Sequence, residues 1–348
     1  MCFIFDLLIC LQAAQCEDYS FEGYEQETEI YLRNKNITSL SADIKNCKKV
    51  KTLDLSCNKL ATLPKEIGEL KDLEVLTLSS NQFKEFPVEL LSCSKLTKLF
   101  LDNNELTEVP SSIKELVNLE NLNLNYNKFI NFPVEIKQLS ELQGLHLGHN
   151  ALERIPAEIG ELQQLVYLDL KNNQLRRLSL DFNNLVRLKF LNLSNNQLFQ
   201  LPAELKGLKE IKHLHLNHNQ FTKLSISIGN LKNLEELDLS NNYLEDLSFG
   251  TEEFETELEH LNLSYNKFEK LPTEIEKMTK LNHLFLFGNK ELKFLPYSIT
   301  NLFSENSNFL IFLSKNYLSA VGTQGETLGE KDLMEKYERF IIFDGPHY

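Results

Sequence analysis

The clearest pattern along the chain is an apolar motif, Leu-x-Leu-x-x-Asn-x-(Leu/Phe), that returns every 23 residues. Its asparagines mark the period; they are Asn58, Asn81, Asn104, Asn127, Asn150, Asn173, Asn196, Asn219 and Asn242. A fixed period of this size indicates a repeat architecture, in which each repeat stacks on its neighbours. The alternation in Leu-x-Leu predicts one short β-strand per repeat, with the leucines facing the core and the strands pairing in parallel.

The second half of each repeat reads Leu-Pro-x-x-Ile-x-x-Leu and predicts a short amphipathic helix. Eight of the nine prolines hold the same position in it: Pro64, Pro87, Pro110, Pro133, Pro156, Pro202, Pro272 and Pro296. We expect them in the first turn, where the missing N–H is no loss. Ser179, Ser225 and Ser248 replace proline in three repeats, so the helical side should differ there. Each asparagine follows a strand, where its amide is expected to bind buried backbone groups as a ladder.

The regular repeats extend over residues 50–318 and are flanked by less regular segments. Residues 17–49 are interpreted as an N-terminal cap followed by a degenerate first repeat around Ile30. Residues 319–348 begin with a predicted loop at Gly322–Gly325. They continue with a predicted helix over Glu330–Phe340 and a strand over Phe340–Phe343. A solenoid must cover its last apolar face, so this tail is interpreted as a C-terminal cap.

The 23-residue Leu-Pro-x-x-Ile-x-x-Leu repeat resembles the intracellular, Ras-binding and plant-type class of leucine-rich repeat proteins over about Ile30 to Leu318. The resemblance implies an α/β fold, a solenoid shaped as a horseshoe. Its parallel β-sheet would line the concave side and its short helices the convex side. The resemblance also implies a family role in protein–protein binding.

Residues 1–16 are predicted to be a signal peptide. An apolar run over Cys2–Leu11 is followed by small residues at Ala14 and Cys16, which favours cleavage before Glu17. The alternative is an apolar segment that stays in place and packs on the first repeat.

The cysteines point to a different compartment. Cleavage would leave Cys47, Cys57 and Cys93. Cys47 and Cys93 hold positions occupied by leucine in other repeats, so they are expected to be buried as small apolar residues. They lie two repeats apart, about 10 Å at the usual strand spacing, which is too far for a disulfide. Free thiols suit a reducing compartment, whereas the predicted signal peptide indicates export. The sequence thus combines an export signal with repeats of the intracellular type.

Composition excludes several function classes. The net charge of −14 argues against nucleic acid and against an anionic membrane surface as partners. No apolar run reaches the ~20 residues of a membrane-spanning helix. The sequence has no glycine-rich phosphate loop, Gly-x-Ser-x-Gly, His-Glu-x-x-His or Cys-x-x-Cys motif. Only thirty residues follow Leu318, too few for a catalytic domain, so we expect a non-enzymatic monomer without a cofactor.

Counting from each asparagine identifies the outward residues of the concave face at repeat positions 3, 5, 7 and 8. Aromatic residues and histidines gather there, and they are the predicted partner-binding residues: Phe100, Tyr126, His146, Tyr167, Phe190, His213, His215, His218, His260, Tyr265, His283, Phe285 and Phe287. Exposed aromatic residues commonly supply binding hot spots. The alternative is that these rings only pair across strands to stabilise the sheet.

A row of His213, Glu236, His260 and His283 also suggests a metal site or a pH-dependent surface. Zinc normally needs three or four ligands, and the row is spread over about 14 Å, so no metal is expected.

The sequence therefore predicts a secreted scaffold that binds another protein through its concave face. The combination of an export signal with intracellular-type repeats favours an effector that acts inside a host cell. One alternative is a cytosolic signalling adaptor or small-GTPase regulator, which requires that residues 1–16 are retained. The other is an enzyme with a cryptic site in the C-terminal tail.

Overall fold

The computed structural model describes residues 18–202, 205, 207–224, 230–247, 257–314, 318–319 and 327–343. The chain divides into two compact units. The first consists of Met1–Phe129 and Gln138–Leu142, and the second of Ile130–Lys137 and Gln143–Tyr348. The predicted signal peptide, residues 1–16, lies outside the described residues.

The first unit contains five strands among its described residues, each three residues long. They are β1 (Glu29–Tyr31), β2 (Thr52–Asp54), β3 (Val75–Thr77), β4 (Lys98–Phe100) and β5 (Asn121–Asn123). Each strand pairs in parallel with the next, as the repeat pattern predicts. The central leucines, such as Leu53, Leu76 and Leu99, are fully buried.

The second unit repeats the arrangement with a longer series of strands. They are β6 (Gly144–His146), β7 (Tyr167–Asp169), β8 (Phe190–Asn192), β9 (His213–His215), β10 (Glu236–Asp238), β11 (His260–Asn262), β12 (His283–Phe285), β14 (Leu310–Leu313) and β16 (Ile341–Phe343). All pair in parallel, in this order. A short antiparallel pair, β13 (Leu295–Pro296) and β15 (Thr327–Leu328), lies outside this sheet.

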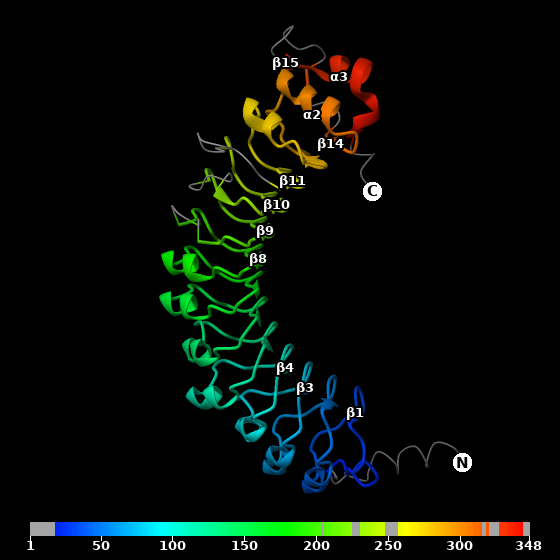
Figure 1. Cartoon of the computed structure of the whole chain (residues 1–348), viewed down its shortest axis with the longest axis vertical. Helices are drawn as coiled ribbons and strands as arrows, with labels where there is room; N and C mark the ends of the chain where they lie inside the picture. The colour runs from blue at the N-terminus through cyan, green and yellow to red at the C-terminus, as the bar shows by residue number, and fades with distance from the viewer. Residues whose placement is uncertain are drawn as a thin grey trace, which may run out of the picture. The chain divides into compact units, whose positions relative to one another are not determined.

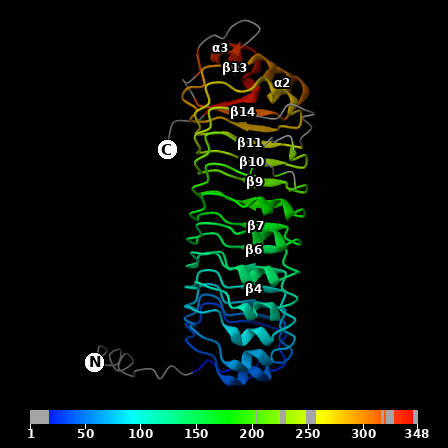
Figure 2. The ribbon, with the colours of Figure 1, turned by 90° about the vertical axis from the view of Figure 1, so that its left-hand side faces the viewer.

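Short 3-10 helices connect the strands. They are η1 (Ala42–Asn46), η2 (Lys65–Glu69), η3 (Val88–Ser92), η4 (Ser111–Glu115), η5 (Val134–Gln138), η6 (Ala157–Glu161), η7 (Leu180–Asn184), η9 (Thr273–Lys277), η10 (Tyr297–Ile299) and η11 (Glu338–Phe340). Within each unit the strands lie on one side and the 3-10 helices on the other (Figure 1). Figure 2 shows the helices of successive repeats stacked within each unit. This arrangement of strand, turn and short helix confirms the predicted solenoid.

Six of the prolines among the described residues are N-caps and so lie one residue earlier than expected: Pro64, Pro87, Pro110, Pro156, Pro272 and Pro296. Pro64 is the N-cap of η2, with φ −70° and ψ 146°, and not a residue of its first turn. The carbonyl oxygen of Pro64 accepts the N–H of Ile67 at 3.0 Å, and this hydrogen bond starts the helix. Ser179 caps η7 in the same place and also accepts the N–H of Asp181 through its hydroxyl. At Ser179 the loss of proline therefore changes the helix cap but keeps the helix. The other two serines, Ser225 and Ser248, lie outside the described residues.

The C-terminal part contains the α-helices α2 (Thr300–Glu305) and α3 (Glu330–Tyr337). Phe303 of α2 stacks on Tyr337 and Phe340, with ring centroids 4.7 Å and 5.1 Å away. Leu333 of α3 is fully buried. The helix and strand foreseen in the tail are thus present as α3 and β16, whereas the predicted loop at residues 322–325 lies outside the described residues.

The asparagine ladder links each repeat to the one before it. In the second unit, Asn196 donates from Nδ2 to the carbonyls of Leu170 and Leu193, both at 3.0 Å. Its Oδ1 accepts the N–H of Leu175 at 3.0 Å. The other ladder asparagines repeat this set, and most of them are buried. One amide thus satisfies backbone groups of two successive turns, as the sequence suggested.

The residue before each ladder asparagine has a left-handed backbone, which the sequence pattern did not reveal. Its φ lies between 52° and 56° in the regular repeats, and the occupants are Cys57, Ser80, Asn103, Tyr126, His149, Asn172, Asn195, His218, Asn241 and Tyr265. Gly288 holds the place in the next repeat with φ 70°. Glycine, asparagine, aspartate and histidine adopt this conformation more readily than other residues, so the turn imposes it on the side chains of Cys57, Ser80, Tyr126 and Tyr265.

Cys47 and Cys93 are buried free thiols, as predicted. Burial raises the pKa of each thiol to about 11. Both are therefore protonated at neutral pH and act as small apolar core residues.

Replacing Asn196 by Ala should destabilise the protein by about 3 kcal/mol, because each buried backbone group left unpaired costs about 1–3 kcal/mol. Urea unfolding followed by circular dichroism measures the change. Gln220→Ala is the matched control because this amide is exposed. A loss for Asn196→Ala no larger than that of the control would contradict the role of the ladder.

Candidate functional site

The exposed face of the sheet in the second unit, here called the strand face, carries two outward rows of side chains. Position 3 of the repeats supplies Tyr167, Phe190, His213, Glu236, His260 and His283, each paired with the next across neighbouring strands. Position 5 supplies His146, Asp169, Asn192, His215, Asp238, Asn262, Phe285 and Phe312 in the same way. Inward leucines fix this register, so the outward residues are free to vary.

The first aromatic stack consists of His146, Tyr167 and Phe190, with His213 and His215 at its end. The rings of Tyr167 and Phe190 are parallel, with centroids 4.4 Å apart and an interplanar angle of 2°. His146 lies 4.6 Å from Tyr167, and His215 lies 5.2 Å from Phe190. All five side chains remain partly exposed. The rings therefore stabilise one another across strands and still present a surface to a partner.

The second aromatic stack consists of His260, His283, Phe285, Phe287 and Phe312. The rings of Phe285 and Phe312 are stacked with centroids 4.3 Å apart, and Phe287 contacts Phe312 edge-on at 6.1 Å. Phe312 was not among the predicted site residues. Its strand follows β12 after 27 residues, because Leu310 pairs with His283, so it lies outside the strict 23-residue series. Counting back from Asn316 in the degenerate last repeat would have identified Phe312 as an outward residue.

An acidic strand separates the two stacks. Glu236 of β10 contacts two histidines of β9: its Oε2 lies 3.1 Å from His213 Nδ1, and its Oε1 lies 3.4 Å from His215 Nε2. Only the first contact has hydrogen-bond geometry, and His215 Nε2 is a buried atom without a hydrogen-bond partner. Asp238 Oδ1 accepts the N–H of Ser240 at 2.9 Å. Carboxylates and imidazoles thus lie side by side between the two aromatic stacks.

His260 and His283 form a stacked pair with centroids 4.8 Å apart and Nδ1 atoms at 3.0 Å. One Nδ1 carries the hydrogen of this contact and the other accepts it, so a second proton is disfavoured. Burial and the neighbouring His260 lower the pKa of His283 below 6.5. The predicted row from His213 to His283 is present as neighbouring residues. Among the described residues, however, no three His, Cys, Asp or Glu side chains gather as a metal site.

Asp169, at the start of the strand face, is a buried carboxylate. It is 2% exposed, and its Oδ1 accepts the N–H of Lys171 at 3.1 Å. Lys171 Nζ lies 3.7 Å from Oδ2. Burial, and then the charge of Asp169, raises the pKa of Tyr167, which therefore stays a neutral phenol. Burial, and then Lys171, lowers the pKa of the nearby His149.

The remaining predicted residues lie elsewhere. Tyr126, His218 and Tyr265 are exposed in the left-handed turns that follow the strands, beyond the strand rows. Phe100 belongs to the first unit, where it lies between Thr77 and Asn123 on β4. Position 8 therefore projects from a turn rather than from the sheet, because the backbone there has a positive φ.

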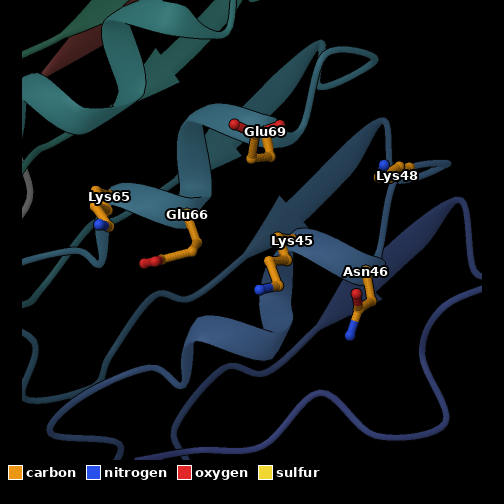
Figure 3. Close-up of a pocket in the computed structure, with 6 residues that line it drawn as sticks. All are labelled: Lys45, Asn46, Lys48, Lys65, Glu66 and Glu69. Atoms are coloured by element: carbon orange, nitrogen blue, oxygen red, sulfur yellow. The ribbon is translucent and has the colours of Figure 1, made fainter.

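The first unit contains a hollow of about 410 Å³ on its helical side. It is lined by Lys45, Asn46, Lys48, Lys65, Glu66 and Glu69 (Figure 3). Its lining has both signs of charge and no aromatic ring. The strand face of the second unit is a stronger candidate because aromatic residues provide most binding hot spots.

No helix in the described part of the chain is long and apolar enough to cross a membrane.

Three family models match the chain. A model described as leucine-rich repeat region matches residues 30–148, one described as leucine rich repeat matches residues 140–198 and 232–290, and one described as leucine rich repeats (2 copies) matches residues 209–250. No curated protein matches the chain by sequence.

Solved structures similar to this chain include proteins of bacteria and plants. A leucine-rich repeat protein of Leptospira interrogans is 34% identical, with a TM-score of 0.74, 82% of this chain covered and 72% of that one. The leucine-rich repeat ectodomain of the Arabidopsis thaliana receptor kinase GASSHO1/SCHENGEN3 is 30% identical, with a TM-score of 0.62, covering 76% of this chain and 33% of that one. An internalin of Listeria monocytogenes shares the fold at 18% identity, with a TM-score of 0.73 and coverages of 93% and 88%.

The His260–His283 pair should make stability fall in mild acid. Because the folded pKa of His283 is below 6.5, its stability contribution is fully present above pH 6.5 and is lost as pH falls toward the folded pKa. We expect a smaller drop in melting temperature for His283→Phe than for the wild type between about pH 7.5 and about pH 5.5. His218→Gln, at an exposed turn, is the control. Equal drops for wild type and His283→Phe would contradict this reading.

Proposed function

The chain belongs to the leucine-rich repeat family, and from this premise we propose that it is a non-enzymatic scaffold that binds a protein partner through the strand face of its second unit. Leucine-rich repeats generally mediate protein–protein interaction. The observation that carries the proposal is the first aromatic stack, in which Tyr167 and Phe190 stack at 4.4 Å while part of both rings faces solvent. Rigid, partly exposed aromatic rings are the side chains that most often dominate binding energy.

The relatives agree with a binding role. The GASSHO1/SCHENGEN3 ectodomain was solved in complex with CASPARIAN STRIP INTEGRITY FACTOR 2, and a plant peptide hormone receptor, RGFR1, in complex with RGF2. These are properties of those proteins, and the chain spans only 33% of the first receptor and 52% of the second. They support a protein or peptide as the partner of this chain without naming it.

The place of action is part of the proposal. The apolar run over Cys2–Leu11, with Ala14 and Cys16 after it, supports secretion. The free buried thiols Cys47 and Cys93 suit a reducing environment, which favours an effector that acts inside another cell. A cytosolic adaptor or small-GTPase regulator is the alternative. The mass of the mature protein separates the two, since secretion predicts a chain that begins at Glu17 and the adaptor a chain that retains residues 1–16.

The binding role can be tested with peptides selected from a random display library on the full chain. The affinity of the selected pool should fall at least about 30-fold for the double variant Phe190→Ala and Phe285→Ala, which removes two hot spots of about 1–2 kcal/mol each. Leu180→Ala is the matched control, because this side chain is apolar and 65% exposed on the helical side. Melting curves check that each variant is folded at the assay temperature.

Unchanged affinity for the double variant, or a larger loss for Leu180→Ala, would place binding away from the strand face and overturn the proposal.

A further inference from the structure

Two carboxylates occupy the middle of the strand face, on β10. Glu236 is 39% exposed, and Asp238 is half-buried on the same strand. The outward neighbours are His213 and His215 on β9 and His260 and Asn262 on β11. A ligand on this face can therefore reach both carboxylates. The side chains that flank them on the neighbouring strands are three histidines and one asparagine.

The lysines near this strand already have acidic partners. Lys212 pairs with Glu235, and Lys189 lies 3.7 Å from Glu210. Lys171 lies 3.7 Å from the buried Asp169. Within the described part of the chain, the ion pairs of Glu236 are with His213 and His215, and no Lys or Arg pairs with Glu236 or Asp238. The centre of the strand face thus has an excess of negative charge that a cationic group would complement.

The surroundings favour arginine over lysine. A guanidinium is planar, donates from a fork that fits carboxylate oxygens, and stacks on flat rings. The imidazoles of His215 and His260 stand on the strands to either side of β10. Lysine would provide the charge without the stacking or the paired hydrogen bonds.

The spacing of the strands gives the shape of the bound segment. Phe190 on β8 and Phe285 on β12 each lie two strands from β10, about 10 Å at the usual strand separation. A polyproline-II segment has three residues per turn and rises about 9 Å over them, so residues three apart share one side. Such a segment, crossing the strands, places an apolar residue on each aromatic stack and the residue midway between them on β10.

We propose that the strand face binds an extended segment of a protein partner with the pattern apolar-x-x-Arg-x-x-apolar, in which the arginine lies on Glu236 and Asp238. This inference rests on the proposed function, because the flanking apolar residues use the two aromatic stacks. It adds to the proposed function that the bound segment is positively charged, that this charge lies on β10 and that the segment is extended.

The test uses a fluorescently labelled peptide, Leu-Pro-Pro-Arg-Pro-Pro-Leu, and versions with Lys, Gln or Glu at the centre. On the full chain we expect the Arg peptide to bind at least about tenfold more tightly than the Gln peptide, and the Glu peptide more weakly still. The double variant Glu236→Gln and Asp238→Asn should remove the difference between Arg and Gln. Glu158→Gln, on the helical side, is the matched control and should keep it.

The outcomes separate this inference from the proposed function. If the Arg and Gln peptides bind wild type equally, and both lose affinity on Phe190→Ala with Phe285→Ala, the assignment of β10 is overturned while binding by the aromatic stacks stands. If the Arg peptide does not bind at all, the inference is overturned by that result alone. If the preference for Arg persists after both carboxylates are neutralised, the cation is bound elsewhere and the inference is again overturned.

Discussion

The ladder of asparagine side chains is the interaction on which the rest of the structure depends. At every turn the chain leaves a three-residue strand and exposes carbonyls that no neighbouring strand can bond. One amide, as at Asn196, bonds carbonyls of its own repeat and of the preceding one and accepts an N–H from the preceding repeat. Each repeat is thereby held to its neighbour at the point where the strand ends. The core leucines then stack in register, because each repeat packs on its neighbours in the sequence.

This frame divides the residues of each repeat into two groups. The inward leucines and the asparagine are nearly invariant because the ladder and the core require them. The outward residues of the strands carry no such constraint, which allows rings and charges to be placed side by side at the strand spacing. On the second unit the result is two aromatic stacks with Glu236 and Asp238 between them. Tyr167 stacks on Phe190 while both side chains stay partly exposed, so cross-strand pairing is compatible with the partner binding proposed above.

Much of the fold could be predicted because a strict period fixes the register of every strand. The parallel pairing, the role of the asparagines and the burial of Cys47 and Cys93 all follow from it. The left-handed residue before each asparagine could not be found in this way. Its occupants range from Asn103 to Tyr126 and His149, so no residue type marks it, and the conformation comes from the turn. For this reason Tyr126, His218 and Tyr265 project from turns rather than from the strand rows.

Phe312 was missed although the sequence could have identified it. The degenerate repeat Ile311-x-Leu313-x-x-Asn316 places it at an outward strand position. The segment before β14 is longer than one period and contains α2, so Phe312 pairs with Phe285 outside the strict 23-residue series. Cross-strand pairing of the rings was one of the two alternatives that the sequence indicated. Which rings stack, and how far each is buried, depends on side-chain rotamers that a sequence does not specify.

The most direct test of the central claim, that a partner occupies the strand face of the second unit, is hydroxyl-radical footprinting of the full chain with and without a bound selected peptide. Aromatic and histidine side chains are the reporters. If a partner covers this face, oxidation of Tyr167, Phe190, Phe285 and Phe312 should be lower in the complex. Oxidation of Tyr297, which is exposed at the start of a 3-10 helix, should not change. Protection at Tyr297 with unchanged oxidation of the four strand-face rings would contradict the claim.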